Sequence, residues 1–254
     1  MTELLFREDA YLQEAEARVL RHSSEGGVVL DRTIFYPTGG GQPGDSGRLD
    51  WSEGGTSGGP KGGLTIATTV KGAPNGARDE IVLIPAEPAP LPPIGSTVTQ
   101  RLDWMRRHHH MRIHTALHLL SVILPYPVTG GAIGTEKGRL DFQMPDPIAD
   151  KQALEIELNA LIERDLVVSE DWISDEELTA NPAIVKTMSV MPPMGPAQNE
   201  GRIRLVRIGQ GRDQIDLQPC GGTHVARTSE IGRIRIGKLE KKGRDNRRVS
   251  IHLD

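Results

Sequence analysis

The stretch MRRHHHMRIHTALHLLSVIL, residues 105–124, decides how the second half of this 254-residue chain is organised. It predicts a helix that ends before Pro125, because proline cannot continue a helix. His114 and His118 lie four residues apart in this stretch. One helical turn places both imidazoles on the same face. The sequence therefore predicts a helix that presents two nitrogen ligands to one point.

The segment PCGGTH, residues 219–224, repeats that spacing far downstream with Cys220, the only cysteine of the chain, and His224. Gly221 and Gly222 disfavour a helix here and permit a tight turn that brings a thiolate and an imidazole together. One sulfur and three nitrogens suit a tetrahedral Zn²⁺ ion. We therefore predict that the two pairs share one zinc ion. The alternative is a β-turn that carries a buried thiol.

The histidine helix has Thr115 at the position where an HExxH metalloprotease carries its glutamate general base. A built-in base is therefore missing. Four protein ligands are typical of a closed, structural zinc site, whereas a catalytic zinc keeps an open position for water. The ligand set alone leaves a catalytic and a structural role open.

The remaining pattern predicts an α+β protein with two domains. Strand-like runs fill the region before residue 100, among them VVLDRTIF (28–35), LTIATTV (64–70) and EIVLI (80–84), and PAEPAPLPPIG (85–95) follows as a linker. After residue 100, an amphipathic helix follows Asp146, the expected N-cap before Pro147. Ser174 and Glu177 predict a capping box for a shorter helix. We expect a β-rich domain at 1–100 and an α+β domain at 101–254.

Composition and charge narrow the class of protein. The net charge is −4, no long apolar run could span a membrane, and no secretory signal pattern opens the chain. With one cysteine, we expect a cytoplasmic protein. Residues 227–248 nevertheless carry nine Lys/Arg against three Asp/Glu. A basic face of this kind can bind phosphates. The candidate phosphate contacts are Arg106, Arg107, Lys238, Lys241, Lys242, Arg244, Arg247 and Arg248.

Four segments together resemble a known family. HTALHLL (114–120) followed by CGGTH (220–224) is similar to the editing domain of alanyl-tRNA synthetases and to the free-standing AlaX alanyl-tRNA editing proteins. YPTGGGQPGDSG (36–47) resembles the glycine-rich motif of the medium-length AlaX group. GGAIGTEKGRLDF (130–142) resembles the segment after the first histidine pair.

This resemblance implies a fold, a site and a reaction. The fold would be a translation-protein-like β-barrel followed by an α/β two-layer editing domain. The site would hold one Zn²⁺ per chain through His114, His118, Cys220 and His224. The reaction would be hydrolysis, in trans, of the ester that joins serine, or glycine as a second substrate, to tRNA(Ala).

Further residues are candidates for selecting the substrate. Alanine lacks the hydroxyl of serine, so a site that must hydrogen-bond this hydroxyl disfavours the alanyl ester. Thr129, beside glycines, is the first candidate for reading it, and Thr115 is the rival. In the glycine-rich loop, Gln42 and Asp45 are the polar candidates. Asp141 or Asp216 could orient a ligand imidazole.

Two other functions remain open at this point. One is a non-catalytic tRNA-binding module with a structural zinc. The other is a metal-dependent hydrolase of a small ester or amide. The first predicts tRNA binding without turnover, and the second predicts activity without tRNA.

Overall fold

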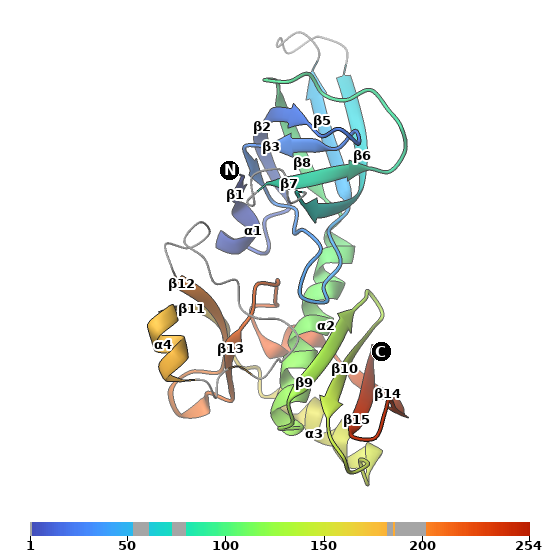
Figure 1. Cartoon of the computed structure of the whole chain (residues 1–254), viewed down its shortest axis with the longest axis vertical. Helices are drawn as coiled ribbons and strands as arrows, with labels where there is room; N and C mark the ends of the chain where they lie inside the picture. The colour runs from blue at the N-terminus through green and yellow to red at the C-terminus, as the bar shows by residue number, and fades with distance from the viewer. Residues whose placement is uncertain (1, 53–60, 73–79, 182–184, 186–201) are drawn as a thin grey trace. The chain divides into compact units, whose positions relative to one another are not determined.

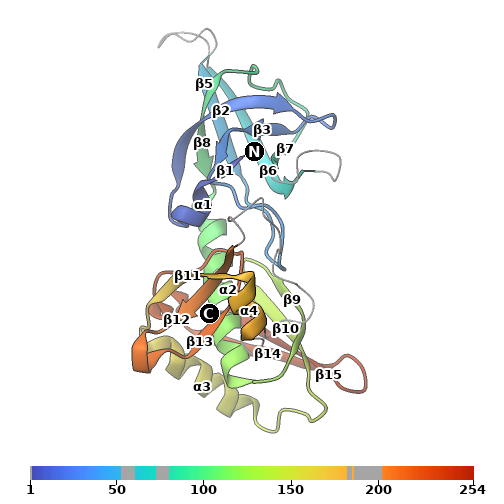
Figure 2. The same ribbon diagram turned by 60° about the vertical axis from the view of Figure 1, so that its left-hand side comes forward.

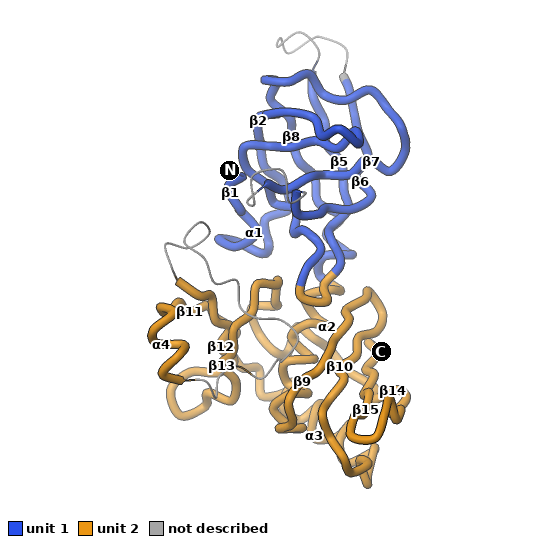
Figure 3. Tube along the Cα trace, viewed as in Figure 1, with its two compact units in different colours: residues 1–39, 43–108 blue, residues 40–42, 109–254 orange. Residues whose placement is uncertain are grey.

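The computed structural model describes residues 2–52, 61–72, 80–181, 185 and 202–254 and divides into two compact units (Figure 3). Unit 1 comprises residues 1–39 and 43–108, and unit 2 comprises residues 40–42 and 109–254. The chain passes from one unit to the other inside helix α2 (Trp104–Ile123). It also enters unit 2 for three residues at the tip of the glycine-rich loop.

Unit 1 contains a closed β-barrel (Figure 1). Its strands, in spatial order, are β2 (Glu14–His22), β3 (Val28–Leu30), β7 (Ile81–Pro85), β6 (Lys61–Lys71), β5 (Gly47–Ser52) and β8 (Thr97–Leu102). Closure removes the exposed edges that an open sheet would leave. The strands predicted at 64–70 and 80–84 are confirmed by β6 and β7. The run at 28–35 is not one strand: it divides into β3 and a second short strand, Arg32–Thr33, that pairs outside the barrel. Of the predicted linker at 85–95, Pro85 ends β7 and the remaining residues lie outside helices and strands.

The barrel is filled by the apolar residues that alternate along its strands. In β2, Ala17 and Val19 are buried while their neighbours Glu16 and Arg18 are exposed. The same core cluster includes Leu30, Leu49, Leu64, Leu83 and Val98. A parallel pair, β1 (Glu3–Leu4) with β4 (Arg32–Thr33), and the short helix α1 (Leu5–Glu8) complete the described part of the unit.

Unit 2 is built around α2 and a four-stranded antiparallel sheet (Figures 1 and 2). The sheet order is β14 (Ile234–Lys241), β15 (Asn246–Leu253), β10 (Lys137–Gln143) and β9 (Val128–Ile133). A Cβ atom on Gly138 of β10 would lie 2.4 Å from Cγ2 of Ile113 and 3.2 Å from Cδ1 of Leu117. This close approach shows that α2 packs directly on the sheet.

Helix α3 (Lys151–Glu163) packs against β14. Asn159 donates to the carbonyl of Ile234 at 2.8 Å and accepts from its N–H at 2.9 Å. The N-cap is Asp150, whose carboxylate accepts from the N–H of Ala153 at 2.9 Å. The prediction of Asp146 as the cap is therefore wrong. Both residues are aspartates, and the helix begins at the one next to its amphipathic face.

A three-stranded sheet forms the rest of unit 2, with the order β11 (Val168–Ser174), β12 (Arg202–Ile208) and β13 (Asp216–Pro219). Helix α4 (Asp175–Ala180) packs on it through Leu178, which clusters with Ile203 and Leu205. The predicted capping box of Ser174 and Glu177 is confirmed. Two short 3₁₀ turns, η2 (Gly211–Asp213) and η3 (Thr228–Ile231), connect the later elements. The barrel, sheets and helices confirm a mixed α+β fold.

Among the described helices, none has the length and hydropathy needed to cross a membrane.

Candidate metal centre

Four ligand-type side chains meet in unit 2. Helix α2 supplies His114 and His118, and the loop after β13 supplies Cys220 and His224. Their candidate ligand atoms all lie within 4.8 Å of one another. Sγ of Cys220 lies 3.5 Å from Nε2 of His114 and 3.6 Å from Nε2 of His224. Nε2 of His224 lies 3.2 Å from Nε2 of His118. One sulfur and three imidazole nitrogens converge, a donor set that can hold one metal ion.

The loop reaches this point because it is not helical. Residues 220–224 have neither helix nor strand conformation. The three imidazoles are buried, with 8% of His114, 6% of His118 and 7% of His224 exposed. Burial of three imidazoles in contact with one thiol is costly unless a cation or protons compensate their lone pairs.

The ionisation of the cluster follows from burial and mutual charge. Burial lowers the pKa of His118, but the hydrogen bond that its ring makes to the Asp216 carboxylate and the nearby Cys220 outweigh this effect and raise the pKa to about 9. Burial lowers the pKa of His224 to about 3. Burial raises the pKa of the Cys220 thiol, yet the neighbouring His114 and His224 imidazoles hold that pKa well below its usual range. A thiolate beside neutral imidazoles is the state that binds metal, and a metal ion would displace a proton from His118.

Asp216 supports one of the ligands. Its Oδ2 atom lies 2.9 Å from Nδ1 of His118. Gln218 donates to the same carboxylate oxygen at 2.7 Å and to Oγ of Ser121 at 3.2 Å. A carboxylate on Nδ1 directs Nε2 of the ring toward the cluster. Of the two aspartates considered from the sequence, Asp216 contacts a ligand.

Asp141 has different partners. Its carboxylate accepts from Arg248 at 2.7 and 2.9 Å and from Arg139 at 2.7 Å. Burial raises the pKa of Asp141, but these two guanidinium groups outweigh it and hold the pKa below its usual value. Asp141 is thus the centre of an ion-pair cluster across β10 and β15.

Residues 220–224, which carry Cys220 and His224, form the ligand loop. Arg204 of β12 holds this loop, a role that the sequence did not predict. Its Nη1 donates to the carbonyls of Cys220 at 2.7 Å and Gly222 at 3.0 Å. The same guanidinium pairs with Glu170 of β11. Two carbonyls of a glycine-containing loop are thereby fixed to a strand. The alternation of IRLVRI predicts a strand, but it carries no signal that an arginine on it turns inward.

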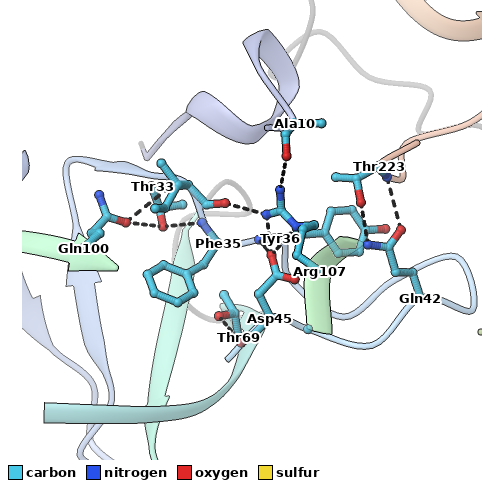
Figure 4. A network of polar contacts seen from close by, with 12 residues as sticks. Ala10, Thr33, Phe35, Tyr36, Gln42, Asp45, Thr69, Gln100, Arg107 and Thr223 are labelled. Carbon is cyan, nitrogen blue, oxygen red and sulfur yellow. Dashed lines mark hydrogen bonds and ion pairs between the residues drawn. The ribbon is translucent and has the colours of Figure 1, made fainter. Parts of the chain in front are cut away.

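The candidate Gln42 lies beside the ligands. Its Oε1 atom lies 3.1 Å from Nδ1 of His114 and accepts the N–H of Thr223 at 3.1 Å. Its Nε2 donates to the hydroxyl of Thr223 at 2.8 Å (Figure 4). The glycine-rich loop therefore delivers one amide to the edge of the cluster.

The candidate Asp45 belongs to a buried ion pair in unit 1 (Figure 4). Its Oδ2 accepts from the N–H of Tyr36 at 2.6 Å and from Nε of Arg107 at 2.9 Å. Arg107 also donates to the carbonyls of Ala10 at 2.9 Å and Ile34 at 2.6 Å. Burial raises the pKa of Asp45, and the Arg107 charge opposes that rise. Arg107 is 0% exposed, so the prediction that it contacts tRNA is wrong: its charge is used inside the protein.

The two threonine candidates differ in accessibility. Thr115 is 0% exposed; its hydroxyl donates to the carbonyl of Met111 at 2.9 Å and accepts from the N–H of Val225 at 3.2 Å. Thr129 is half-buried. Its hydroxyl donates to the carbonyl of Asp141 at 3.1 Å and accepts from Nδ2 of Asn246 at 2.8 Å. Because a hydroxyl has two lone pairs, one acceptor position of Thr129 is left over.

The basic candidates of β14 and β15 fall into two groups. Arg247 and Arg248 are half-buried and bonded to Pro145 and Asp141. The exposed members are Lys238, Lys241, Lys242 and Arg244. Arg106 is half-buried on α2. The β14–β15 hairpin therefore carries the exposed cations of this group. Three of them pair with acidic neighbours: Lys238 and Lys242 with Glu240, and Arg244 with Asp245.

Comparison with known proteins gives two kinds of match. A family model described as the threonyl and alanyl tRNA synthetase second additional domain matches residues 203–250. An alanyl-tRNA editing protein AlaX-M of Methanosarcina acetivorans is 34% identical over 259 residues, which cover 100% of this chain and 99% of the relative. The AlaX-M protein of Saccharolobus solfataricus is 34% identical, with 98% of both chains covered.

The chain belongs to the alanyl-tRNA editing protein family. The family is also related to a longer enzyme: the alanine–tRNA ligase of Caldivirga maquilingensis is 33% identical over 94% of this chain, but the match covers only 25% of the ligase. The matches to the AlaX-M proteins and to the ligase confirm the resemblance inferred from HTALHLL and CGGTH. The family model spans β12 to β15 and thus includes Cys220, His224 and the strand that carries Arg204.

Proposed function

We propose that the chain hydrolyses the ester of seryl-tRNA(Ala) in trans, with glycyl-tRNA(Ala) as a second substrate, and that it uses one Zn²⁺ bound by His114, His118, Cys220 and His224. The observation that carries the proposal is the buried convergence of these four side chains in a full-length relative of AlaX-M proteins. Editing proteins of this family are deacylases that hydrolyse the aminoacyl-tRNA ester bond. The protein would act in the cytoplasm, where tRNA is charged.

The domains have separate roles in this proposal. Residues 1–100 form a translation-protein-like barrel that supplies the glycine-rich motif. Residues 101–254 form the two-layer editing domain. The division is supported by the closed barrel and by the metal cluster, whose four members all follow residue 101.

The chain's own residues prepare the site for a metal. A zinc ion held there would act as a Lewis acid on the ester carbonyl. Cys220 is poised as a thiolate ligand because three imidazoles surround its sulfur, so we assign it no role as a nucleophile. Asp216 holds the ring of His118 from behind. This support keeps the Nε2 atom of His118 directed toward the other three ligand atoms.

Selection of serine is assigned to Thr129, with Thr115 as the rival. Thr129 is the better placed of the two because its hydroxyl is half-buried and retains one acceptor position, whereas Thr115 is fully buried. The serine hydroxyl would donate to that position. An alanyl ester would leave the position unpaired and is disfavoured by this loss.

Binding of tRNA is assigned to the exposed cations of the β14–β15 hairpin, above all Lys238 and Arg244, whose side chains are 78% and 95% exposed. Such side chains contact phosphates and position an RNA without reading its sequence. Their contribution should weaken as salt rises, because binding releases counterions.

The deciding experiment measures deacylation of seryl-, glycyl- and alanyl-tRNA(Ala) by the wild type and by Cys220→Ala, with zinc content measured in parallel. Loss of the seryl ester, retention of the alanyl ester, and an inactive variant without zinc are expected. Tight tRNA binding without hydrolysis of any ester would instead favour a tRNA-binding module with a structural zinc. Hydrolysis of small esters without tRNA would favour a general metal-dependent hydrolase.

A further inference from the structure

The tip of the glycine-rich loop, residues 40–42, is part of unit 2. The carbonyl of Gly41 accepts from the N–H of Ile133, at the end of β9, at 2.9 Å. This bond fixes the backbone just before Gln42. The side chain of Gln42 is 1% exposed, and a buried amide needs partners for its polar atoms. The identity of those partners indicates what Gln42 does.

Thr223 determines which way the amide of Gln42 is turned. A backbone N–H can only donate, so the amide atom 3.1 Å from the N–H of Thr223 is the oxygen Oε1. The nitrogen Nε2 then faces the hydroxyl of Thr223 at 2.8 Å and donates to it. Two bonds to one residue leave no freedom to exchange the oxygen and the nitrogen (Figure 4).

The orientation of the amide has a consequence for His114. The same Oε1 atom lies 3.1 Å from Nδ1 of His114. Because Oε1 is an acceptor, Nδ1 must carry the hydrogen of the neutral ring, and the lone pair is then on Nε2. Nε2 is the atom that lies 3.5 Å from Sγ of Cys220.

We propose that Gln42 is a positioning residue, which holds His114 in the Nδ1–H tautomer and fixes the direction of its Nε2 lone pair toward the metal position. The proposal rests on the metal-binding role of His114 in the proposed function. It assigns Gln42 to the support of a ligand, in place of the substrate selection expected from the sequence. Oε1 already accepts two hydrogen bonds, so it has no remaining lone pair for a substrate.

Gly222 provides independent support for this arrangement. A Cβ atom at Gly222 would lie 2.3 Å from Cε1 and 2.6 Å from Nδ1 of His114, and 2.8 Å from Oε1 of Gln42. Any side chain there would occupy the space in which the ring and the amide meet. The ligand loop therefore leaves room for this one contact.

The test compares Gln42→Leu with Gln42→Glu in the full chain. Leucine removes the acceptor, whereas glutamate keeps an oxygen for both N–H groups, and the Thr223 hydroxyl can turn to donate. Gln152→Leu is the matched control, because Gln152 is exposed on α3. Zinc affinity is measured by competition with a chromophoric chelator, and ligand geometry by the visible spectrum of the Co²⁺ form.

Gln42→Leu is expected to bind zinc about 10–100-fold more weakly, the usual effect of losing a group that orients a metal ligand. Its cobalt spectrum should shift. Gln42→Glu keeps the acceptor oxygen and should not show the loss of zinc affinity expected for Gln42→Leu. Gln152→Leu should stay close to the wild type in both measurements. A Gln42→Leu protein with wild-type zinc affinity and an unchanged cobalt spectrum would overturn the proposal.

A measurement on the unmutated protein keeps the test valid if Gln42→Leu fails to fold. Long-range ¹H–¹⁵N spectra of the zinc-loaded wild type should show the hydrogen of His114 on Nδ1. A hydrogen on Nε2 would refute the proposal directly. If the wild type fails to hydrolyse seryl-tRNA(Ala) while Gln42→Leu still loses zinc affinity, the proposed function fails and the role of Gln42 stands.

Discussion

Oδ2 of Asp216 lies 2.9 Å from Nδ1 of His118, and both side chains are buried. This contact joins β13, which carries Asp216, to α2, which carries His114 and His118. It fixes one imidazole from behind, as Gln42 does for His114. The two supports differ in charge, since one is a carboxylate and the other a neutral amide.

Replacing Asp216 with asparagine should weaken zinc binding about 10–100-fold, because the ring of His118 loses its charged acceptor. Chelator competition at constant pH measures the change. Asp213→Asn is the matched control, since its side chain is 77% exposed and lies in the same loop region. Equal zinc affinity in the two variants would show that the Asp216 contact does not support the ligand.

Gly222→Ala should abolish tight zinc binding, because the added methyl carbon would lie 2.3 Å from Cε1 of His114. Gly221→Ala is the neighbouring control: nothing lies within 4 Å of a Cβ atom at that position. Zinc content after dialysis distinguishes the two proteins. If both retain zinc equally, the close packing of the loop on the ring is not required.

The ion pair of Asp45 and Arg107 should matter for stability. Arg107→Met leaves a buried carboxylate without its partner, which costs about 3–5 kcal/mol of unfolding free energy. Denaturant titration of each single variant and of Arg107→Met with Asp45→Asn measures the coupling. The double variant should lose less than the sum of the single losses. Additive losses would contradict a direct interaction.

Acid stability should depend on Asp165. The guanidinium of Arg227 and the hydroxyl of Ser229 lower the pKa of Asp165 from its usual 3.8 to about 2. A lowered pKa stabilises the folded state above the unfolded pKa, and this stabilisation is lost as the pH falls from ~4 to ~2. The wild type should therefore melt higher than Asp165→Asn near neutral pH, and the gap should narrow in acid.

The choice of asparagine isolates the charge of Asp165. The residue has a φ of 52°, a left-handed conformation that asparagine adopts more readily than other residues. The backbone is thereby retained while the charge is removed. A difference in melting temperature that is constant over the whole acid range would rule out titration of Asp165 as its cause.

Thr129→Val should raise hydrolysis of alanyl-tRNA(Ala) relative to seryl-tRNA(Ala), because the remaining acceptor for the serine hydroxyl is lost. The ratio of kcat/KM for the two esters is the measurement. Thr115→Val serves as the comparison, since Thr115 is the rival. Thr129 would be excluded if its variant still cleared the seryl ester and spared the alanyl ester as the wild type does.

The metal cluster was readable from the sequence because its signals are local. Two pairs of ligand residues at a spacing of four, one on a helix and one beside two glycines, needed only the geometry of a helical turn and a tight loop. The same holds for the capping box of Ser174 and Glu177, in which the partners are three residues apart. The donor chemistry of one sulfur and three nitrogens predicted that the two pairs share one ion, and the family resemblance supported this prediction.

Residues whose roles depend on distant partners were not readable. The sequence predicted Arg107 to be a basic surface residue. It is buried because it pairs with Asp45, which lies 62 positions away in the sequence. Arg204 and Gln218 occupy strands on which an inward polar residue looks like any other. Gln42 was chosen for its motif, yet its bond to Thr223 spans 181 positions. A polar side chain can be buried only where a partner residue satisfies it. A single sequence does not show which distant residues form such pairs.

The three-residue excursion of the chain into unit 2 limits how this protein can be divided. A protein expressed from residue 101 onward would retain all four candidate ligands but would lack Gln42 and the bond of Gly41 to Ile133. Such a fragment would be a defective metal binder rather than a minimal enzyme. If the first hundred residues were exchanged between relatives, the incoming loop tip at residues 40–42 would have to fit the ligand loop and β9 of the recipient. The two parts are therefore expected to be inherited together.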